Sequence, residues 1–313
     1  MLKVVTGASG FVGNVLVRQL LDRGHELRVI ERRPSVSLAG LAVERVKADM
    51  LDPDSLRLAF AGADTVYHLA AIIPHGGLSR QAMFDLNING VRNLLDACRH
   101  CGVRRLVHVS TINAHQPRPR RDALTEDRPL IGPDQAGRVP PYSWSKALAE
   151  SLVLEAAGGD LEVVVASPSA IIGPLDFAPS PLGRLVLDLA CGRQTILVDG
   201  GCNLVDVRDL AAGIIAAADR GKSGHSYLLA GEDVSLARLA SLVGGVAGTD
   251  RRRIVLPMPV AHLGRPFVAM AGRVARREPL YTGDTLWPLT FHRLVSSAKA
   301  RQELGFTTRP LQD

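Results

Sequence analysis

Aromatic residues are scarce in this chain of 313 residues, and neither basic nor apolar residues form long runs. Phe, Trp and Tyr make up only 4% of the sequence, and the net charge of +6 comes from short arginine clusters. Nucleic-acid binding is therefore weakly supported, and we expect no nucleic-acid partner. No stretch approaches the ~18 consecutive apolar residues of a membrane-spanning helix, so no membrane span is expected. The clusters are Arg104-Arg105, Arg118 with Arg120 and Arg121, Arg251–Arg253, and Arg273 with Arg276 and Arg277.

Cysteine is also rare, and the sequence predicts no metal site. Cys98 and Cys101 form a C-x-x-C pair, but no second pair stands at zinc spacing, which favours free thiols in a reduced, cytoplasmic setting. The other two cysteines are Cys191 and Cys202. The chain begins directly with a predicted strand and gives no sign of a signal peptide. The nine histidines form no pair of ligands one helical turn apart, and His68 and His108 are interpreted as core residues.

Hydrophobic residues make up 46% of the chain, which is enough to bury a large core. Predicted strands and helices alternate through the first half, and this pattern indicates a parallel sheet covered by helices on both faces. We therefore predict an α/β fold, a Rossmann-type doubly wound parallel sheet with a smaller, mostly C-terminal lobe. The predicted strands are Leu2–Val5, Glu26–Ile30, Val43–Lys47, Thr65–Leu69, Arg105–Ser110 and Leu161–Ala166, and the helices are Val12–Arg23, Pro53–Ala61, Ser79–His100 and Tyr142–Ala157.

A glycine-spaced turn, Thr6–Gly13 (TGASGFVG), lies between the first predicted strand and the first helix. Gly7 would permit a tight turn, Gly10 would let the backbone approach a pyrophosphate, and Gly13 would let the helix pack closely. The helix N-terminus would supply N–H groups and the positive end of a dipole. An ordinary strand–helix turn is the alternative, but the position directly after a strand favours dinucleotide binding.

Glu31 closes the second predicted strand, 18 positions after Gly13. A carboxylate at this place can accept hydrogen bonds from the adenosine ribose hydroxyls of NAD. Arg32 and Arg33 follow, and their guanidinium groups could instead bind the 2′-phosphate of NADP. A solvated charged loop is a third interpretation. We expect NAD or NADP as the cofactor, with NAD favoured.

Asp49 follows the predicted strand Val43–Lys47. Its carboxylate could contact the adenine amino group, but a role in capping the next helix is about as plausible. Asp52 is the better cap, because Pro53 would then take the first helical position.

Tyr142 and Lys146 stand one turn apart at the start of a predicted helix and would face the same way. An ammonium close to a phenol lowers the phenol's pKa from about 10, so Tyr142 could give or take a proton while a hydride moves. Ser110 and Thr111 end another predicted strand, where a hydroxyl could bind the substrate oxygen. A simple turn is the alternative for these two residues.

Together and in this order, the motifs resemble those of the extended short-chain dehydrogenase/reductases, the NAD-dependent epimerase/dehydratase family. The resemblance covers nearly the whole chain, and Pro168–Arg193 looks most like the dihydroflavonol-reductase-like branch. That branch includes hopanoid-associated sugar-epimerase-like proteins and is related to 3β-hydroxysteroid dehydrogenases. The resemblance rests on Thr6–Gly13, Asp49-Met50, His68–Ala71 (HLAA), Asn87–Gly90, Asn93–Leu95, Ser110-Thr111, Tyr142–Lys146 (YSWSK), Ser167–Ser169 with Gly173-Pro174, and Val205–Asp209.

Position by position, the resemblance implies a catalytic set of Thr111, Tyr142 and Lys146. It implies that Asn87 lies on a helix that backs the active site, and that the family's four-helix face could make a homodimer. The implied cofactor-binding residues are Gly7, Ser9, Gly10, Phe11, Val12, Gly13, Glu31, Arg32, Asp49, Met50, Leu69, Ala70, Ala71, Asn87, Ser110, Tyr142, Lys146, Pro168 and Ser169.

The dinucleotide-binding domain is expected to comprise residues 1–167 with a return segment at about 203–222. Pro and Gly become frequent after residue 167, and residues of about 168–202 and 223–313 are expected to form the substrate-binding lobe. The elements predicted there are helix Leu182–Cys191, strand Val205–Val207, helix Asp209–Arg220 and strand Ser226–Ala230.

Two departures from the family's sugar epimerases bear on the substrate. Those enzymes often carry Val-Tyr-Gly where this chain has Asn113–His115, and Arg where it has Ser167. We therefore expect an NAD(P)-dependent oxidoreductase that acts on a carbonyl or secondary alcohol of a small or medium organic substrate. A nucleotide-sugar epimerase or dehydratase is the alternative, and a non-catalytic nucleotide-sensing protein is a third. No spacing within about 75–85, 112–140 or 170–300, where the substrate should bind, identifies it.

Overall fold

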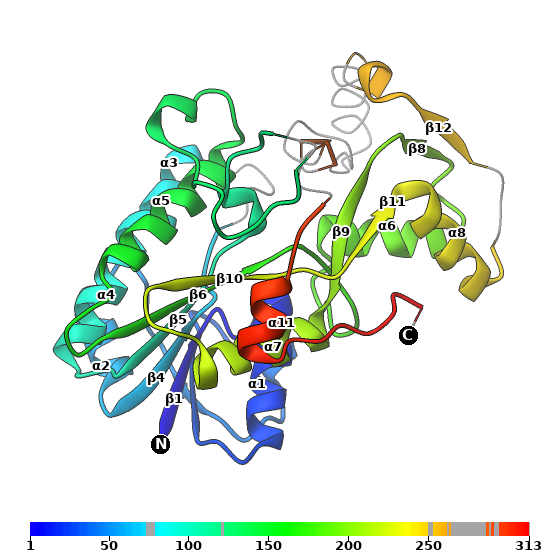
Figure 1. Ribbon diagram of the computed structural model, residues 1–313. Helices are drawn as coiled ribbons and strands as arrows, with labels where there is room; N and C mark the ends of the chain where they lie inside the picture. Colours follow the sequence, from blue (N-terminus) through cyan, green and yellow to red (C-terminus); the bar gives the residue numbers. More distant parts are fainter. Residues whose placement is uncertain are drawn as a thin grey trace.

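Seven parallel strands form the centre of the part of the chain that the structure describes, residues 1–72, 79–119, 122–249, 253–261, 263, 286–287, 289–290 and 294–312. In this computed structural model the strand order is β10-β6-β5-β4-β1-β2-β3 (Figure 1). The predicted doubly wound α/β fold is confirmed. The strands are β1 (Leu2–Thr6), β2 (Leu27–Ile30), β3 (Glu44–Val46), β4 (Ala63–His68), β5 (Arg105–Val109), β6 (Glu162–Pro168) and β10 (His225–Leu229).

Helices cover both faces of this sheet, because neighbouring residues of a strand point to opposite sides. Val5 of β1 packs with α1 (Phe11–Asp22), α7 (Val207–Arg220) and α11 (Ala298–Leu304). Val4 packs in a second cluster with α2 (Pro53–Phe60), α4 (Gly90–His100) and α5 (Pro141–Glu155). The two faces thus bury two separate apolar cores, and the strands between them are largely buried except for β3 at the edge.

The order in which parallel strands are added to the sheet reverses at β1. From β1 it builds outward through β2 and β3, and then returns to the other side of β1 with β4, β5 and β6. In open α/β sheets ligands bind at such a switch point, outside the carboxyl ends of the strands. The loops that follow β1, β2, β4, β5 and β6 therefore frame the candidate site.

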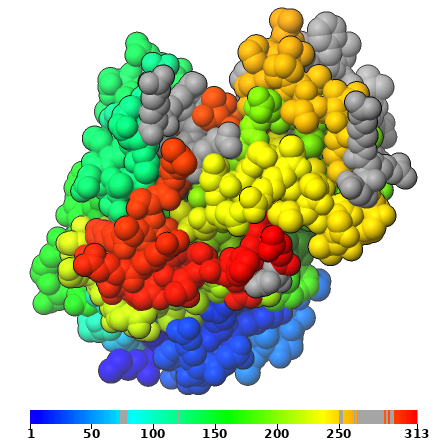
Figure 2. Space-filling view, turned by 45° about the vertical axis from the view of Figure 1, so that its right-hand side comes forward, coloured from blue at the N-terminus to red at the C-terminus, as the bar shows by residue number. Residues whose placement is uncertain are grey.

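A smaller set of elements packs beside the carboxyl edge of the large sheet. β7 (Ala170–Ile172), β9 (Gly201–Asp206) and β11 (Glu232–Ser235) form one sheet, and β8 (Ile196–Val198) pairs with β12 (Ile254–Leu256). Helices α6 (Pro181–Ala190) and α8 (Leu236–Ala247) contribute to its apolar core. Figure 2 shows a notch between the green part that contains α5 and the yellow-to-orange part that contains α8 and β12.

Two predicted elements differ from those observed, and four short strands were not predicted. The helix predicted at Ser79–His100 is divided into α3 (Arg80–Phe84), a π-helical turn at Asp85–Asn89 and α4. The strand predicted at Val205–Val207 ends one residue earlier, because the Asp206 carboxylate accepts the Arg208 N–H and caps α7. The local sequence pattern did not predict the short strands β7, β8, β11 and β12.

The sheets cross the expected domain boundaries. β10, expected in the substrate lobe, pairs with β6 in the large sheet, whereas β9 of the expected return segment pairs with β7 and β11. The division into two domains stays a prediction. Parts of the arginine clusters and of the expected substrate loops lie outside the described residues, namely residues 73–78, 120–121, 250–252 and most of 262–293.

Candidate active site

The turn after β1 is built so tightly that two of its glycines have no room for a side chain. Gly7 has a φ of +67°, and a Cβ there would lie 2.6 Å from the Ala70 nitrogen. A Cβ at Gly13 would lie 2.2 Å from the Gly7 oxygen. Gly10 is the N-cap of α1, and no side chain caps that helix end. The first N–H groups of α1, at Phe11, Val12 and Gly13, are thus available to an anion.

Glu31 lies directly after β2, where the sequence places it beside the adenosine. Its Oε1 accepts a hydrogen bond from Arg45 of β3 at 3.3 Å. Its Oε2 is buried and has no hydrogen-bond partner, so this oxygen is free to accept ribose hydroxyls. Arg32 and Arg33 are exposed at the same edge. No local pattern predicts the ion pair between Arg45 and Glu31, because this pair depends on the register of β2 and β3.

Asp49 stabilises the turn before α2, a role that the sequence left open beside adenine binding. Its Oδ1 accepts the Leu51 N–H at 2.9 Å, and its backbone is bound to the Ser55 hydroxyl. As expected, Asp52 caps α2, with Pro53 at the first helical position. Met50 is 6% exposed and packs in the core beneath the sheet. Contacts of Asp49 and Met50 with adenine stay a prediction.

The loop after β4 lies against the glycine turn and is held from behind by Asn87. Leu69 and Ala70 donate their N–H groups to the backbone oxygen and the hydroxyl of Thr6. Asn87, in the π-helical turn, binds both backbone groups of Ile72 at 2.8 and 3.2 Å. It also donates to Ser145 Oγ at 3.0 Å. Because the amide is used inside the protein, we expect Asn87 to position this loop, which includes Ala71, rather than touch the cofactor.

Lys146 joins α5 to the end of β5. Its Nζ donates to the backbone oxygen of Val109 at 2.8 Å, and the residue is only 3% exposed. Burial lowers the pKa of Lys146 to about 8. The predicted lowering of the Tyr142 pKa is wrong for this structure: burial raises the pKa of Tyr142 to about 12.

Three hydroxyl groups follow the ends of β5 and β6, those of Ser110, Thr111 and Ser169. Ser110 Oγ is buried without a hydrogen-bond partner, and Ser169 Oγ, next to Pro168, is in the same state. Thr111 is 9% exposed, and its Oγ1 accepts the Asn113 N–H at 3.3 Å. A long bond of this kind leaves the hydroxyl hydrogen available to a substrate oxygen.

His68 and His108 lie side by side beneath these residues, on β4 and β5. Their ring centroids are 5.2 Å apart, and both are fully buried. Burial lowers both pKa values, so both rings stay neutral at pH 7. His68 shares a hydrogen bond with Thr6 Oγ1 at 2.8 Å, which ties the ring to the glycine turn.

The model for the family described as "NAD dependent epimerase/dehydratase family" matches residues 3–230 of this chain. The chain belongs to this family. It is an enzyme family of the extended short-chain dehydrogenase/reductases, and its members use NAD(P). The chain is accordingly an NAD(P)-dependent oxidoreductase of that family.

Relatives match the chain over nearly its whole length. "Sterol demethylase protein B" of Methylococcus capsulatus is 36% identical, over 97% of this chain and 93% of the relative. A "putative dihydroflavonol 4-reductase" of Synechocystis is 32% identical, over 96% of this chain and 88% of the relative. The crystal structure described as gox2253 has a TM-score of 0.86 and 33% identity, and the match covers 100% of this chain and 94% of that one.

The residues of this family member fit NAD(P). The glycine turn leaves a space that a Cβ would fill, and the unpaired oxygen of Glu31 faces no protein donor. Ser110 and Ser169 add unpaired hydroxyls at the other end of the strand edge. Along the edge from β2 through β1 to β5 and β6, these groups would suit the adenosine ribose, the pyrophosphate and the nicotinamide ribose of a dinucleotide, in that order.

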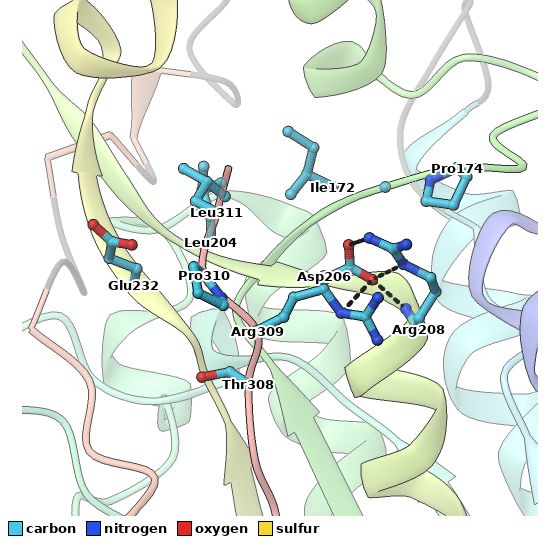
Figure 3. Close-up of a pocket in the computed structure, with 11 residues that line it drawn as sticks. Ile172, Pro174, Leu204, Asp206, Arg208, Glu232, Thr308, Arg309, Pro310 and Leu311 are labelled. Carbon is cyan, nitrogen blue, oxygen red and sulfur yellow. Dashed lines mark hydrogen bonds and ion pairs between the residues drawn. The ribbon is translucent and has the colours of Figure 1, made fainter. Parts of the chain in front are cut away.

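A hollow of about 200 Å³ lies between the small sheet and the C-terminal segment (Figure 3). Asp206 faces it, but Arg208 binds this carboxylate at 2.7 Å, and Arg309 binds Asp209 at 2.8 Å. Because these charged groups pair with one another, we interpret the hollow as a structural contact between the C-terminal segment and α7 and not as a binding site. Its lining contains none of the residues predicted for the family's active site.

Within the part of the chain that the structure describes, no three His, Cys, Asp or Glu side chains lie close enough together to hold a metal ion. No helix in the described ranges is long and apolar enough to cross a bilayer. Cys98 and Cys101 are free thiols in the structure.

Proposed function

We propose that this enzyme transfers a hydride between nicotinamide and a carbonyl or secondary alcohol carbon of an organic substrate. One observation supports the proposal most: Lys146 of α5 donates a hydrogen bond to the backbone oxygen of Val109, the last residue of β5, directly before Ser110 and Thr111. A proton donor, a cation and a hydroxyl are thus gathered beside the cofactor crevice. This is the set that carbonyl reduction needs.

In this proposal Tyr142 gives its proton to the substrate oxygen during reduction and takes it back during oxidation. Because burial raises its pKa to about 12, Tyr142 is protonated at pH 7 and is ready to donate. Thr111 donates a hydrogen bond to the same oxygen. Lys146 carries the positive charge that stabilises the phenolate which remains. Bound nicotinamide supplies or accepts the hydride.

The substrate class follows from what the relatives are called and from this chain's departures from sugar epimerases. The names of two relatives contain the words sterol and dihydroflavonol, and both words denote ring compounds that carry hydroxyl or keto groups. Asn113 and Ser167 stand where sugar epimerases of the family often have other residues. We therefore propose a cyclic alcohol or ketone rather than a nucleotide sugar as the substrate.

The test is a screen of cyclic ketones and alcohols with NADH, NADPH and their oxidised forms, in which Tyr142→Phe accompanies the wild type. We expect the variant to lose at least about a hundredfold in turnover, which is the usual contribution of a general acid. Cofactor affinity, measured by nicotinamide fluorescence, should be retained and serves as the control. Turnover close to wild type would remove Tyr142 from the mechanism. Retained NAD, with isomerisation of a nucleotide sugar and no change in nicotinamide absorbance, would favour the epimerase alternative.

We also propose that NAD is preferred over NADP. The unpaired Oε2 of Glu31 suits ribose hydroxyls and would repel a 2′-phosphate. Glu31→Gln should weaken NADH binding by roughly tenfold, as expected when a hydrogen bond to a charged group is lost, and should leave NADPH binding unchanged or stronger. Equal loss for both cofactors would show that Glu31 acts only through its pairing with Arg45.

A further inference from the structure

A buried carboxylate lies one helical turn beyond the active-site lysine. Tyr142, Lys146 and Glu150 are spaced by four residues on α5, so they share one face of the helix. Glu150 is 1% exposed, which is unusual for a glutamate and indicates that partners hold it there. The hydride-transfer roles described above do not use this residue.

Serine hydroxyls from three strands surround Glu150. Ser226 of β10 donates to Glu150 Oε1 at 3.0 Å, and Ser110 and Ser167 lie at the ends of β5 and β6 beside the same carboxyl. Oε2 has no hydrogen-bond partner in the structure. The group is therefore only partly compensated by hydrogen bonds, and a buried carboxylate in this state needs a nearby cation.

Lys146 lies one turn away on the same face of α5, makes no direct ion pair with Glu150, and each of the two residues opposes the effect of burial on the pKa of the other. Burial lowers the pKa of Lys146, and Glu150 raises it. Burial raises the pKa of Glu150, whereas Ser110, Ser226, Lys146 and Ser167 lower it. The Val109 carbonyl, which accepts the lysine's hydrogen bond, has a dipole but no charge.

We propose that Glu150 is a positioning residue of the active site: it keeps Lys146 charged from the side away from the substrate, and the Ser226 hydroxyl, which donates to its Oε1, favours the ionised carboxylate. This inference rests on the proposed function only in its consequence for turnover. The coupling of the two charges belongs to the protein itself and can be measured without cofactor.

Other titratable groups near the pair do not replace Glu150. His68 and His108, on β4 and β5, are neutral at pH 7 because burial lowers their pKa values, and Tyr142 is protonated there. On the side of β10, Lys299 of α11 donates to the backbone oxygen of Ser226 at 2.9 Å.

The chain contains five lysines, so the titration of Lys146 can be followed directly. We would label lysine side chains with ¹³C or ¹⁵N, record their NMR signals against pH in the protein without cofactor, and assign Lys146 as the signal that Lys146→Met lacks. In Glu150→Gln the midpoint of this signal should fall by about one pH unit, which is the lower end of the effect of a nearby opposite charge. Glu155→Gln, an exposed position on the same helix, is the matched control and should leave the midpoint unchanged.

Ser226→Ala provides a second variant that leaves both charged residues in place. Loss of the hydrogen bond to Oε1 disfavours the ionised carboxylate, so the Lys146 midpoint should fall in the same direction by a smaller amount. If Glu150→Gln fails to fold, this variant still decides the matter. An unchanged midpoint in both variants, or in the one that folds, would overturn the proposal.

Activity gives a separate readout. For ketone reduction, the fall in rate at high pH should move to lower pH in Glu150→Gln by the same interval as the NMR midpoint, and should not move in Glu155→Gln. A purely structural role would reduce the rate at every pH and leave the position of this fall unchanged. If the NMR midpoint shifts but no ketone is reduced by any variant or by the wild type, the proposed function fails and the coupling of Glu150 to Lys146 stands.

Discussion

Two glycines of the turn after β1 allow the packing of the fold to be separated from the binding of the cofactor. A Cβ on Gly13 would lie 2.2 Å from the Gly7 oxygen and 2.8 Å from Ala8 Cα. Comfortable contacts lie near ~3.5 Å, so α1 would have to move by roughly 1 Å. A Cβ on Gly10 would meet only the Gly7 oxygen, at 3.2 Å, and could be accommodated by a few tenths of an ångström.

Gly13→Ala should therefore lower the free energy of unfolding by about 1–3 kcal/mol, the usual cost of overpacking. Gly10→Ala should cost less than about 1 kcal/mol, because alanine is only a poorer helix N-cap than glycine. Both values would be measured by urea unfolding without cofactor, and NADH affinity by fluorescence titration.

The informative variant is Gly10→Ala. If the backbone at Gly10 approaches the pyrophosphate, its new methyl group should weaken NADH binding by about tenfold or more, equivalent to ~1.4 kcal/mol, while stability is nearly kept. NADH binding as tight as in the wild type would refute the phosphate role of this turn. A Gly13→Ala protein as stable as the wild type would refute the packing argument.

Two further predictions concern pH and thiols. Burial lowers the pKa of His115 to about 4. Below about pH 6.5 this imidazole is therefore protonated in the unfolded chain but stays neutral in the folded protein until about pH 4. Stability should fall as pH drops from about 6.5 to 4, by up to roughly 3 kcal/mol from this residue, and His115→Gln should flatten that part of a pH series of urea midpoints. With a thiol reagent, exposed Cys191 should react in the folded protein, whereas Cys98, whose pKa burial raises, should react only on unfolding; rapid labelling of Cys98 would contradict its burial.

Local patterns predicted the parts of the site that depend on local geometry. The turn at Gly7 and Gly13 could be predicted because glycine spacing reports directly on backbone conformation and close approach. The Tyr142–Lys146 pair could be predicted because positions four apart on a helix share a face. These features need no knowledge of which distant segments meet.

Features that depend on distant segments could not be predicted in this way. Arg45 meets Glu31 only because β2 and β3 pair in a particular register. The pKa of Tyr142 was predicted in the wrong direction, since spacing says nothing about how deeply a phenol is buried. Glu150 resembles an ordinary helix glutamate in sequence, and its spacing from Lys146 was the one available signal.

The position of β10 at the edge of the large sheet has a consequence for how the protein could be divided. The chain leaves the large sheet after β6, builds β7, α6, β8 and β9, and comes back with α7 and β10 before it leaves again at β11. A fragment that stops before residue 223 would keep every residue of the glycine turn and the Tyr142–Lys146 pair. It would nevertheless bare the edge of β6 and remove Ser226 from Glu150. The large sheet is therefore contiguous in space but has no single end point in sequence, and the hydrogen bond to Glu150 comes from a strand that joins this sheet only after β7, α6, β8 and β9 have formed.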